Sequence, residues 1–198
     1  MTDQAFDVLR YVGKQWLIAG VGGYGFFTPA AHGIAVMDTM TCNYRGWIAD
    51  FSMDAMDNVL RLSHATVFLD PAQHDLDNPP LLFDTAYSKE GALCGYSFDA
   101  NEPLIAFTGG LLIDEWRDDY PASLHVTGVE LPFHENVHEL IFEDGFLIES
   151  YDRTEMVNNF DAATNTSKGR HKRVRQLDGA AQNRLIFRYK DIRFEQIE

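Results

Sequence analysis

The sequence predicts a mainly β protein, whose antiparallel sheet is curved into a barrel or a two-layer arrangement and preceded by a short N-terminal helix. Apolar and polar residues alternate along several stretches, as they do in a strand with one buried face. The pair Asp144-Gly145 separates two such stretches and is typical of a tight hairpin turn. The chain has 198 residues, 45% of them hydrophobic and 13% aromatic, which is enough for one sizeable core and excludes an intrinsically disordered chain.

The first two predicted elements differ in the spacing of their apolar residues. Residues 3–12 place Leu9 on the apolar stripe of a short helix, which Gly13 would end. Residues 44–53 alternate with a period of two, and a turn-forming stretch leads from them into a second alternating strand that includes Leu60. The residues of the first strand that share its apolar face are Trp47, Ala49, Phe51 and Met53. This region is therefore predicted to form an antiparallel hairpin.

The remaining chain continues in the same way. Residues 70–80 are rich in Pro, Asp and Asn without periodicity, which predicts a loop. Residues 137–151 form a hairpin around Asp144-Gly145. Further strands are predicted in residues 103–114, 123–131 and 184–194. We expect a single domain over residues 1–198, with a seam at 70–80 left open and a basic segment at 168–198.

Charge divides the chain into an acidic body and a basic end. The formal net charge is −14, and nine of the 16 Lys and Arg lie between residues 168 and 193. Residues 1–167 carry 7 cations against 26 acids, a net charge of −19, so this body repels phosphate and argues against nucleic-acid binding by the whole protein. The cations that could contact an anionic partner, or dock against the acidic body of the chain, are Lys168, Arg170, Lys172, Arg173 and Arg175.

Residues 40–150 also carry a series of short motifs. The first is an Arg-Gly-aromatic-x-Ala-x-aromatic strand, which is followed by a Leu-x-Leu strand. An apolar strand that contains a Thr-Gly pair comes next, and then a His-x-x-Gly segment and a final hairpin rich in Leu and Ile. The residues concerned are Arg45, Gly46, Trp47, Ala49, Phe51, Leu60, Leu62, Phe107, Thr108, Gly109, Leu112, His125, Gly128 and the stretch from Leu140 to Ile148. In these motifs the chain resembles a family of uncharacterised bacterial proteins rich in β-structure. The resemblance implies a β-rich fold and a bacterial protein, and it assigns no activity and no catalytic residue.

A His-Glu-x-x-His pattern is formed by His134, Glu135 and His138. On a helix this spacing places two imidazoles on one face to bind zinc, with the Glu as general base on the metal-bound water. Pro132 and the alternating residues that follow predict a strand instead, on which the two imidazoles would lie about 13 Å apart, too far to share a zinc ion. A zinc-dependent hydrolase with His134 and His138 as ligands and Glu135 as base is therefore kept as the alternative function.

A Gly-x-Gly-x-x-Gly pattern runs from Gly20 to Gly25, as in the turns that bind dinucleotides. The helix that should follow would contain Pro29 in its interior and Gly33 shortly after it. The glycines therefore predict a β-turn or a bulge where two backbones approach closely.

The remaining sequence features point to contact with a partner rather than to catalysis. Trp116 and Arg117, flanked by four acids, are candidates for contact with a partner. The two Cys exclude a disulfide scaffold. The start of the sequence lacks the basic and apolar regions of a signal peptide, and no apolar run approaches the roughly 20 residues that cross a bilayer, so we expect a cytoplasmic protein without a membrane contact.

These observations favour a non-enzymatic binding protein. It would bind a protein partner, or a small ligand in the concavity of the sheet, and would need no cofactor. Self-association into a homodimer is a further possibility. The acidity of the body suits neutralisation of a basic partner, such as a toxin domain.

Overall fold

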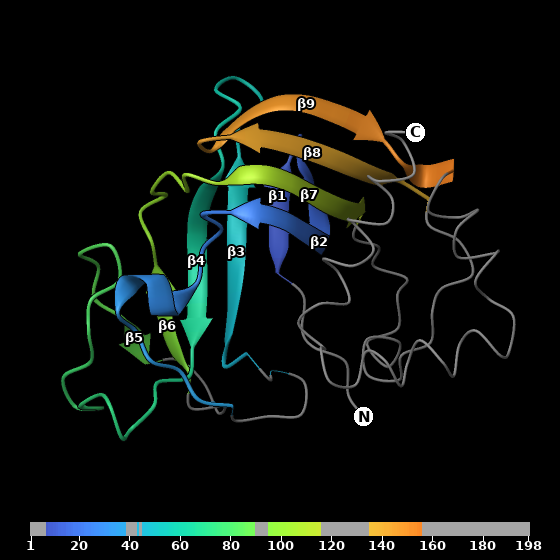
Figure 1. The fold of residues 1–198 in the computed structure, drawn as a ribbon. Helices are drawn as coiled ribbons and strands as arrows, with labels where there is room; N and C mark the ends of the chain where they lie inside the picture. The colour runs from blue at the N-terminus through green and yellow to red at the C-terminus, as the bar shows by residue number, and fades with distance from the viewer. Residues whose placement is uncertain (1–6, 39–42, 44, 90–94, 116–134, 156–198) are drawn as a thin grey trace, which may run out of the picture.

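The computed structural model of the chain describes residues 7–38, 43, 45–89, 95–115 and 135–155. These residues form one mixed sheet of nine strands in the order β5-β6-β4-β3-β1-β2-β7-β8-β9 (Figure 1). The strands are β1 Val8–Tyr11, β2 Lys14–Tyr24, β3 Trp47–Met53, β4 Arg61–Val67, β5 Ser88–Lys89, β6 Tyr96–Asp99, β7 Thr108–Glu115, β8 Val137–Glu143 and β9 Phe146–Asp152. A short 3₁₀ helix, η1, spans Pro29–His32. The prediction of a mainly β fold is thus confirmed.

The N-terminal helix predicted for residues 3–12 is wrong where the structure describes this segment, because Val8–Tyr11 form strand β1. Leu9 lies in register with Trp16 of β2 on one side and with Phe51 of β3 on the other, and its side chain is fully buried. Gly13 belongs to the turn of the β1–β2 hairpin. In so short a segment, pairing with two neighbouring strands outweighs a weak helical pattern. Among the described residues, no helix is long and apolar enough to cross a membrane.

The sheet is mixed rather than purely antiparallel, because β1 and β3 run parallel to each other. β1 first turns back into β2, and the chain then returns on the other side of β1 to enter β3. A parallel neighbour requires such a crossover connection, and the hairpin signals in the sequence report only antiparallel neighbours.

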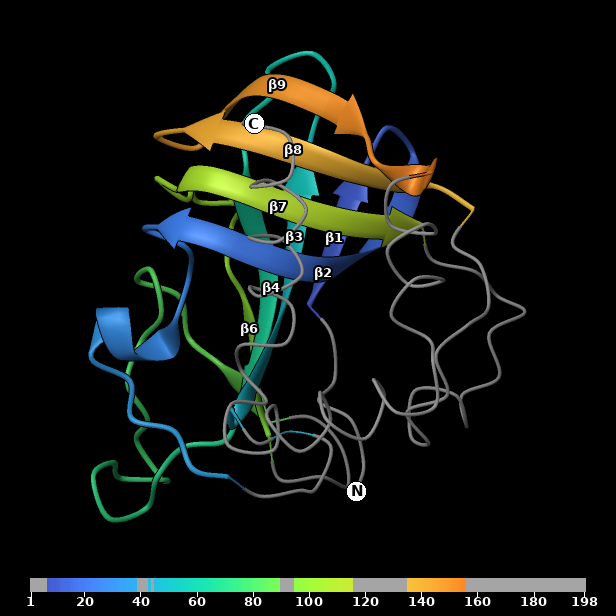
Figure 2. The same ribbon diagram turned by 45° about the vertical axis from the view of Figure 1, so that its right-hand side comes forward.

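The sheet bends so that β2, β7, β8 and β9 lie across β3 and β4 (Figures 1 and 2). Its end strands β5 and β9 do not pair with each other, so the described strands do not close into the predicted barrel. Among the described residues, β9 meets the first half of the sheet at the turn before β4, in an isolated bridge between Val59 and Phe146. Within the described residues, no full-length strand pair joins the two ends of the sheet, as a barrel would require.

Apolar side chains fill the space inside the bend. The predicted apolar face of residues 47–53 is confirmed, because all four of its residues are buried. Each fully buried large side chain contributes about 1.5–3 kcal/mol to stability. Core residues from both parts of the sheet are Leu9, Phe51, Leu62, Phe98, Phe107, Leu111, Ile113, Leu140 and Phe142.

The glycine pattern at Gly20–Gly25 lies where the paired strands β2 and β7 approach each other closely. A Cβ on Gly23 would lie 2.2 Å from the carbonyl oxygen of Thr108, and one on Gly109 would lie 2.1 Å from that of Gly22. The pairing of β2 with β7 also shifts register between Ile18 and Gly20. The prediction of a bulge with close backbone approach is confirmed.

Candidate binding surface

The surface of the described residues is strongly acidic. They contain twenty Asp and Glu against six Lys and Arg, and fourteen of the twenty acids are exposed. Four of the six cations already form ion pairs with carboxylates at 2.6–2.7 Å. These pairs are Lys14–Glu115, Arg45–Asp7, Arg61–Asp57 and Arg153–Glu139. The exposed surface is therefore suited to cations supplied by another molecule.

Three segments that are distant in sequence meet at one end of the bent sheet. They are the turn before β4, the loop before β7 and the tip of the β8–β9 hairpin. Backbone hydrogen bonds join them: the Leu60 N–H donates to the Gly145 carbonyl at 2.8 Å, and the Leu147 N–H donates to the Asn58 carbonyl at 2.9 Å. The Ile105 N–H donates to the Leu60 carbonyl at 2.9 Å. We call this region the acidic corner, and its carboxylates are Asp54, Asp57, Glu102, Glu143 and Asp144.

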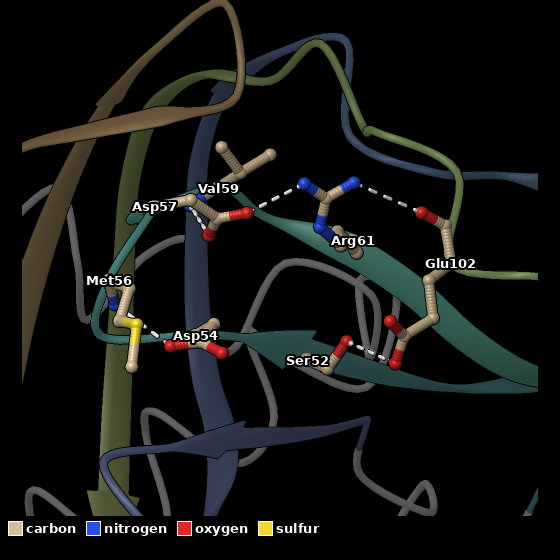
Figure 3. A network of polar contacts seen from close by, with 7 residues as sticks. All are labelled: Ser52, Asp54, Met56, Asp57, Val59, Arg61 and Glu102. Carbon is tan, nitrogen blue, oxygen red and sulfur yellow. Dashed lines mark hydrogen bonds and ion pairs between the residues drawn. The ribbon is translucent and has the colours of Figure 1, made fainter.

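The turn before β4 is held by its own carboxylates (Figure 3). Asp54 accepts a hydrogen bond from the Met56 N–H at 2.8 Å, and Asp57 accepts one from the Val59 N–H at 3.1 Å. Arg61 donates to the other oxygen of Asp57 at 2.7 Å, and this bond, with that of Val59, holds the pKa of the Asp57 carboxyl below its ordinary value. Asp57 therefore stays ionised in mildly acidic solution.

The other two segments are fixed in a similar way. The Ser52 hydroxyl donates to the Glu102 carboxylate at 3.3 Å, which holds this side chain beside β3 (Figure 3). In the hairpin tip, Asp144 and Gly145 both have positive φ, at 48° and 88°, as a tight type I′ turn requires. The Thr108 hydroxyl accepts a hydrogen bond from the Asp144 N–H at 2.9 Å and so ties the tip to β7.

Exposed apolar side chains lie among these carboxylates. Met56 is 94% exposed, Phe146 is 49% exposed and Leu104 is 41% exposed. Arg61 is the one cation among the described residues of the corner, which leaves it a formal charge of −4. Exposed apolar side chains beside charged ones are typical of an interaction surface, and Met adapts its shape to a partner.

The His-Glu-x-x-His residues lie away from this corner. His138 is on β8, where its ring packs edge-on against Trp16 with the centroids 5.2 Å apart. Glu135 is exposed just before β8, and His134 lies outside the described residues. The predicted strand is thus confirmed for His138. Within the part of the chain that the structure describes, no group of three or more His, Cys, Asp or Glu could hold a metal ion.

The remaining candidates from the sequence, Trp116, Arg117, Lys168, Arg170, Lys172, Arg173 and Arg175, also lie outside the described residues. The sequence did show both turns of the corner, as a polar stretch after residue 53 and as Asp144-Gly145, but it did not show that they meet. Glu102 and Met56 were missed, because a lone acid and a lone Met in a turn give no signal until the folded chain places them together. No protein family matches the chain, and neither a curated protein nor a solved structure matches it significantly.

Proposed function

We propose that this protein is a non-enzymatic binding protein whose acidic corner takes a basic protein partner. The observation that carries the proposal is that three segments which meet in the fold bring five carboxylates together with exposed Met56 and Phe146. Complementary charge would steer a basic partner towards the corner, and burial of the apolar side chains would add about 25 cal/mol per Å² of apolar surface.

The packing inside the bent sheet favours a binding site at the acidic corner and argues against a ligand site in the concavity. Aromatic side chains pack against one another there, with the rings of Phe26 and Phe51 4.8 Å apart and those of Phe107 and Phe142 5.9 Å apart. A ligand would have to displace this core, whereas the acidic corner is already open to solvent.

The test uses the full-length protein and a fluorescent peptide in which Arg and Leu alternate. Fluorescence anisotropy should show binding that weakens at least about tenfold between low and high salt, because salt screens exposed charges. A peptide with Glu in place of Arg should not bind. Tight binding that does not depend on salt, or equal binding of both peptides, would contradict the proposal.

Two matched sets of substitutions locate the site. Asp54→Asn, Glu102→Gln, Glu143→Gln and Asp144→Asn together remove four charges from the corner, and each new side chain keeps an oxygen that can accept the same hydrogen bonds. The control set removes four exposed charges elsewhere, by Asp38→Asn, Asp75→Asn, Asp77→Asn and Asp84→Asn. The corner set should weaken peptide binding about tenfold and the control set less than about threefold. Equal losses would show that net charge, and not the corner, binds the peptide.

A further inference from the structure

Strand β9 forms one end of the sheet, and among the described strands it pairs only with β8. Six of its seven residues are exposed, whereas the opposite end strand, β5, has two residues. An end strand carries a row of backbone N–H and C=O groups that another extended chain can pair with. β9 is thus long enough to take a further strand.

Part of this edge is already occupied. Phe146 bridges to Val59 and the Leu147 N–H donates to the Asn58 carbonyl, so the turn before β4 covers the start of the strand. The Arg153 N–H donates to the Val137 carbonyl on the β8 side. Because backbone groups alternate in direction along a strand, those of Ser150 and Asp152 point away from β8. Among the described residues, the part of β9 without a partner on this side therefore runs from Ile148 to Asp152, and we call it the open edge.

The side chains along the open edge are anionic and partly apolar. Ile148 is 53% exposed and Tyr151 is 41% exposed, and both lie among the exposed carboxylates of Glu149 and Asp152. The strand contains neither Lys nor Arg. A second copy of β9 would bring like charges together, whereas a strand with cationic side chains would meet opposite charge.

The open edge is continuous with the acidic corner, since Phe146 belongs to both. We propose that an extended basic segment of the partner adds to the sheet beside residues 148–152, with its backbone bonded to Ser150 and Asp152 and its cations on the face of Asp152. Its apolar residues then lie on the opposite face, where they cover Tyr151. This inference rests on the proposed function, because the same partner occupies the corner and the edge. Strand addition supplies backbone hydrogen bonds, and the alternating side chains supply selectivity.

The test again uses the full-length protein and two versions of the Arg-Leu peptide. One is N-methylated at every Leu and the other at every Arg, so both have the same charge and composition. Only alternate residues of an added strand bond to the edge, so one version should bind at least about tenfold more weakly than the other. Equal affinity of the two versions, with the corner substitutions still weakening binding, would overturn strand addition and leave the proposed function standing. Failure of even the unmethylated peptide to bind would count against both proposals.

Hydrogen exchange gives a second measurement on the protein itself. The backbone amides of Ser150 and Asp152 should exchange quickly in the free protein and at least about tenfold more slowly with the unmethylated peptide bound. Slow exchange in the free protein would show that the basic segment 168–198 of the chain, or a second copy, already covers the edge, and would overturn the proposal.

A variant pair completes the test. Ser150→Pro removes an outward N–H while keeping the pairing with β8, so it should weaken peptide binding at least about fivefold. Ser150→Ala keeps the N–H and should bind as the unchanged protein does. Equal binding by the Pro and Ala variants would contradict the proposal, and a melting temperature measured for both shows that each is folded.

Discussion

The acidic corner and the loop at residues 70–77 are both rich in carboxylates, but they are built differently. In the loop, Asp70 accepts hydrogen bonds from the Ala72 N–H and the Gln73 side chain, and Asp75 accepts one from the Asp77 N–H. These contacts are all local in sequence, and those of Asp70 lower the pKa of its carboxyl. The corner combines local turns with segments more than 40 residues apart. Carboxylates of the loop shape their own backbone, whereas those of the corner form a surface that exists only in the folded protein.

The largest expected effect comes from breaking the assembly of the corner. Gly145→Ala should destabilise the protein by about 3–5 kcal/mol, because its φ is 88° and the new Cβ would lie 2.4 Å from the carbonyl oxygen of Ile105. Gly33→Ala is the matched control, with a φ of 73° and no atom within 4 Å of the new Cβ, and should cost about 1 kcal/mol. Thermal unfolding of both variants measures the difference. A small loss for Gly145→Ala would mean that the corner is loosely assembled.

A smaller effect should distinguish the apolar parts of the two regions. Met56→Ser removes a side chain that is 94% exposed and should leave the melting temperature unchanged while weakening binding of the Arg-Leu peptide about threefold to tenfold. Leu76→Ser makes a similar change in the loop, where Leu76 is 38% exposed, and should leave binding unchanged. Equal effects of the two substitutions on peptide affinity would remove the distinction between the regions.

Asp50 tests a carboxylate that belongs to neither region. Burial raises the pKa of its carboxyl, and the His64 ring on β4 and Arg10 on β1 lower it less than burial raises it. A raised pKa disfavours the charged form in the folded state, so the protein loses stability as the pH rises through that pKa. Asp50→Asn should therefore raise the melting temperature at neutral pH by about 1–3 °C, with the gain shrinking towards pH 4. A melting temperature that falls at neutral pH would show that His64 and Arg10 outweigh burial.

The smallest effect is expected at Glu135, an exposed carboxylate outside both regions. Glu135→Gln removes one charge, so peptide affinity should change by less than about twofold. The same variant tests the zinc-hydrolase alternative. Zinc measured at one equivalent per chain and lost on His138→Ala, together with a hydrolytic activity abolished by Glu135→Gln, would favour the hydrolase over the binding protein.

Local patterns predicted the local parts of the fold. The hairpin of β3 and β4 and the hairpin of β8 and β9 were both visible, because alternation and an Asp-Gly turn act within a few residues. Strand β1 was missed, because its four residues take their conformation from partners at Trp16 and Phe51. The parallel pairing was missed, and the sequence did not decide between a barrel and a two-layer arrangement, because both features depend on contacts that no short window contains.

In the candidate site, too, the sequence shows the local turns but does not show the contacts between distant segments. The turns that carry Asp54 and Asp144 could be found from the sequence, and the excess of acid could be counted. Their proximity could not, because it depends on the Leu60–Gly145 backbone contact, which spans 85 residues. Glu102 enters the site through the Ser52 hydroxyl, a contact that likewise depends on the register of the sheet.

The acidic corner joins segments that are far apart in the sequence, so it cannot form until late in the synthesis of the chain. The turn before β4 leaves the ribosome early, but Leu147, which completes the corner, is 80 residues behind Val67, the end of β4. At about 5–20 residues per second, translation takes about 4–16 s to cover that interval. During this time the first half of the sheet, β1 to β4, can pair while the turn at Asn58 still lacks Leu147. A nascent chain therefore lacks the complete acidic corner until Leu147 has been synthesised.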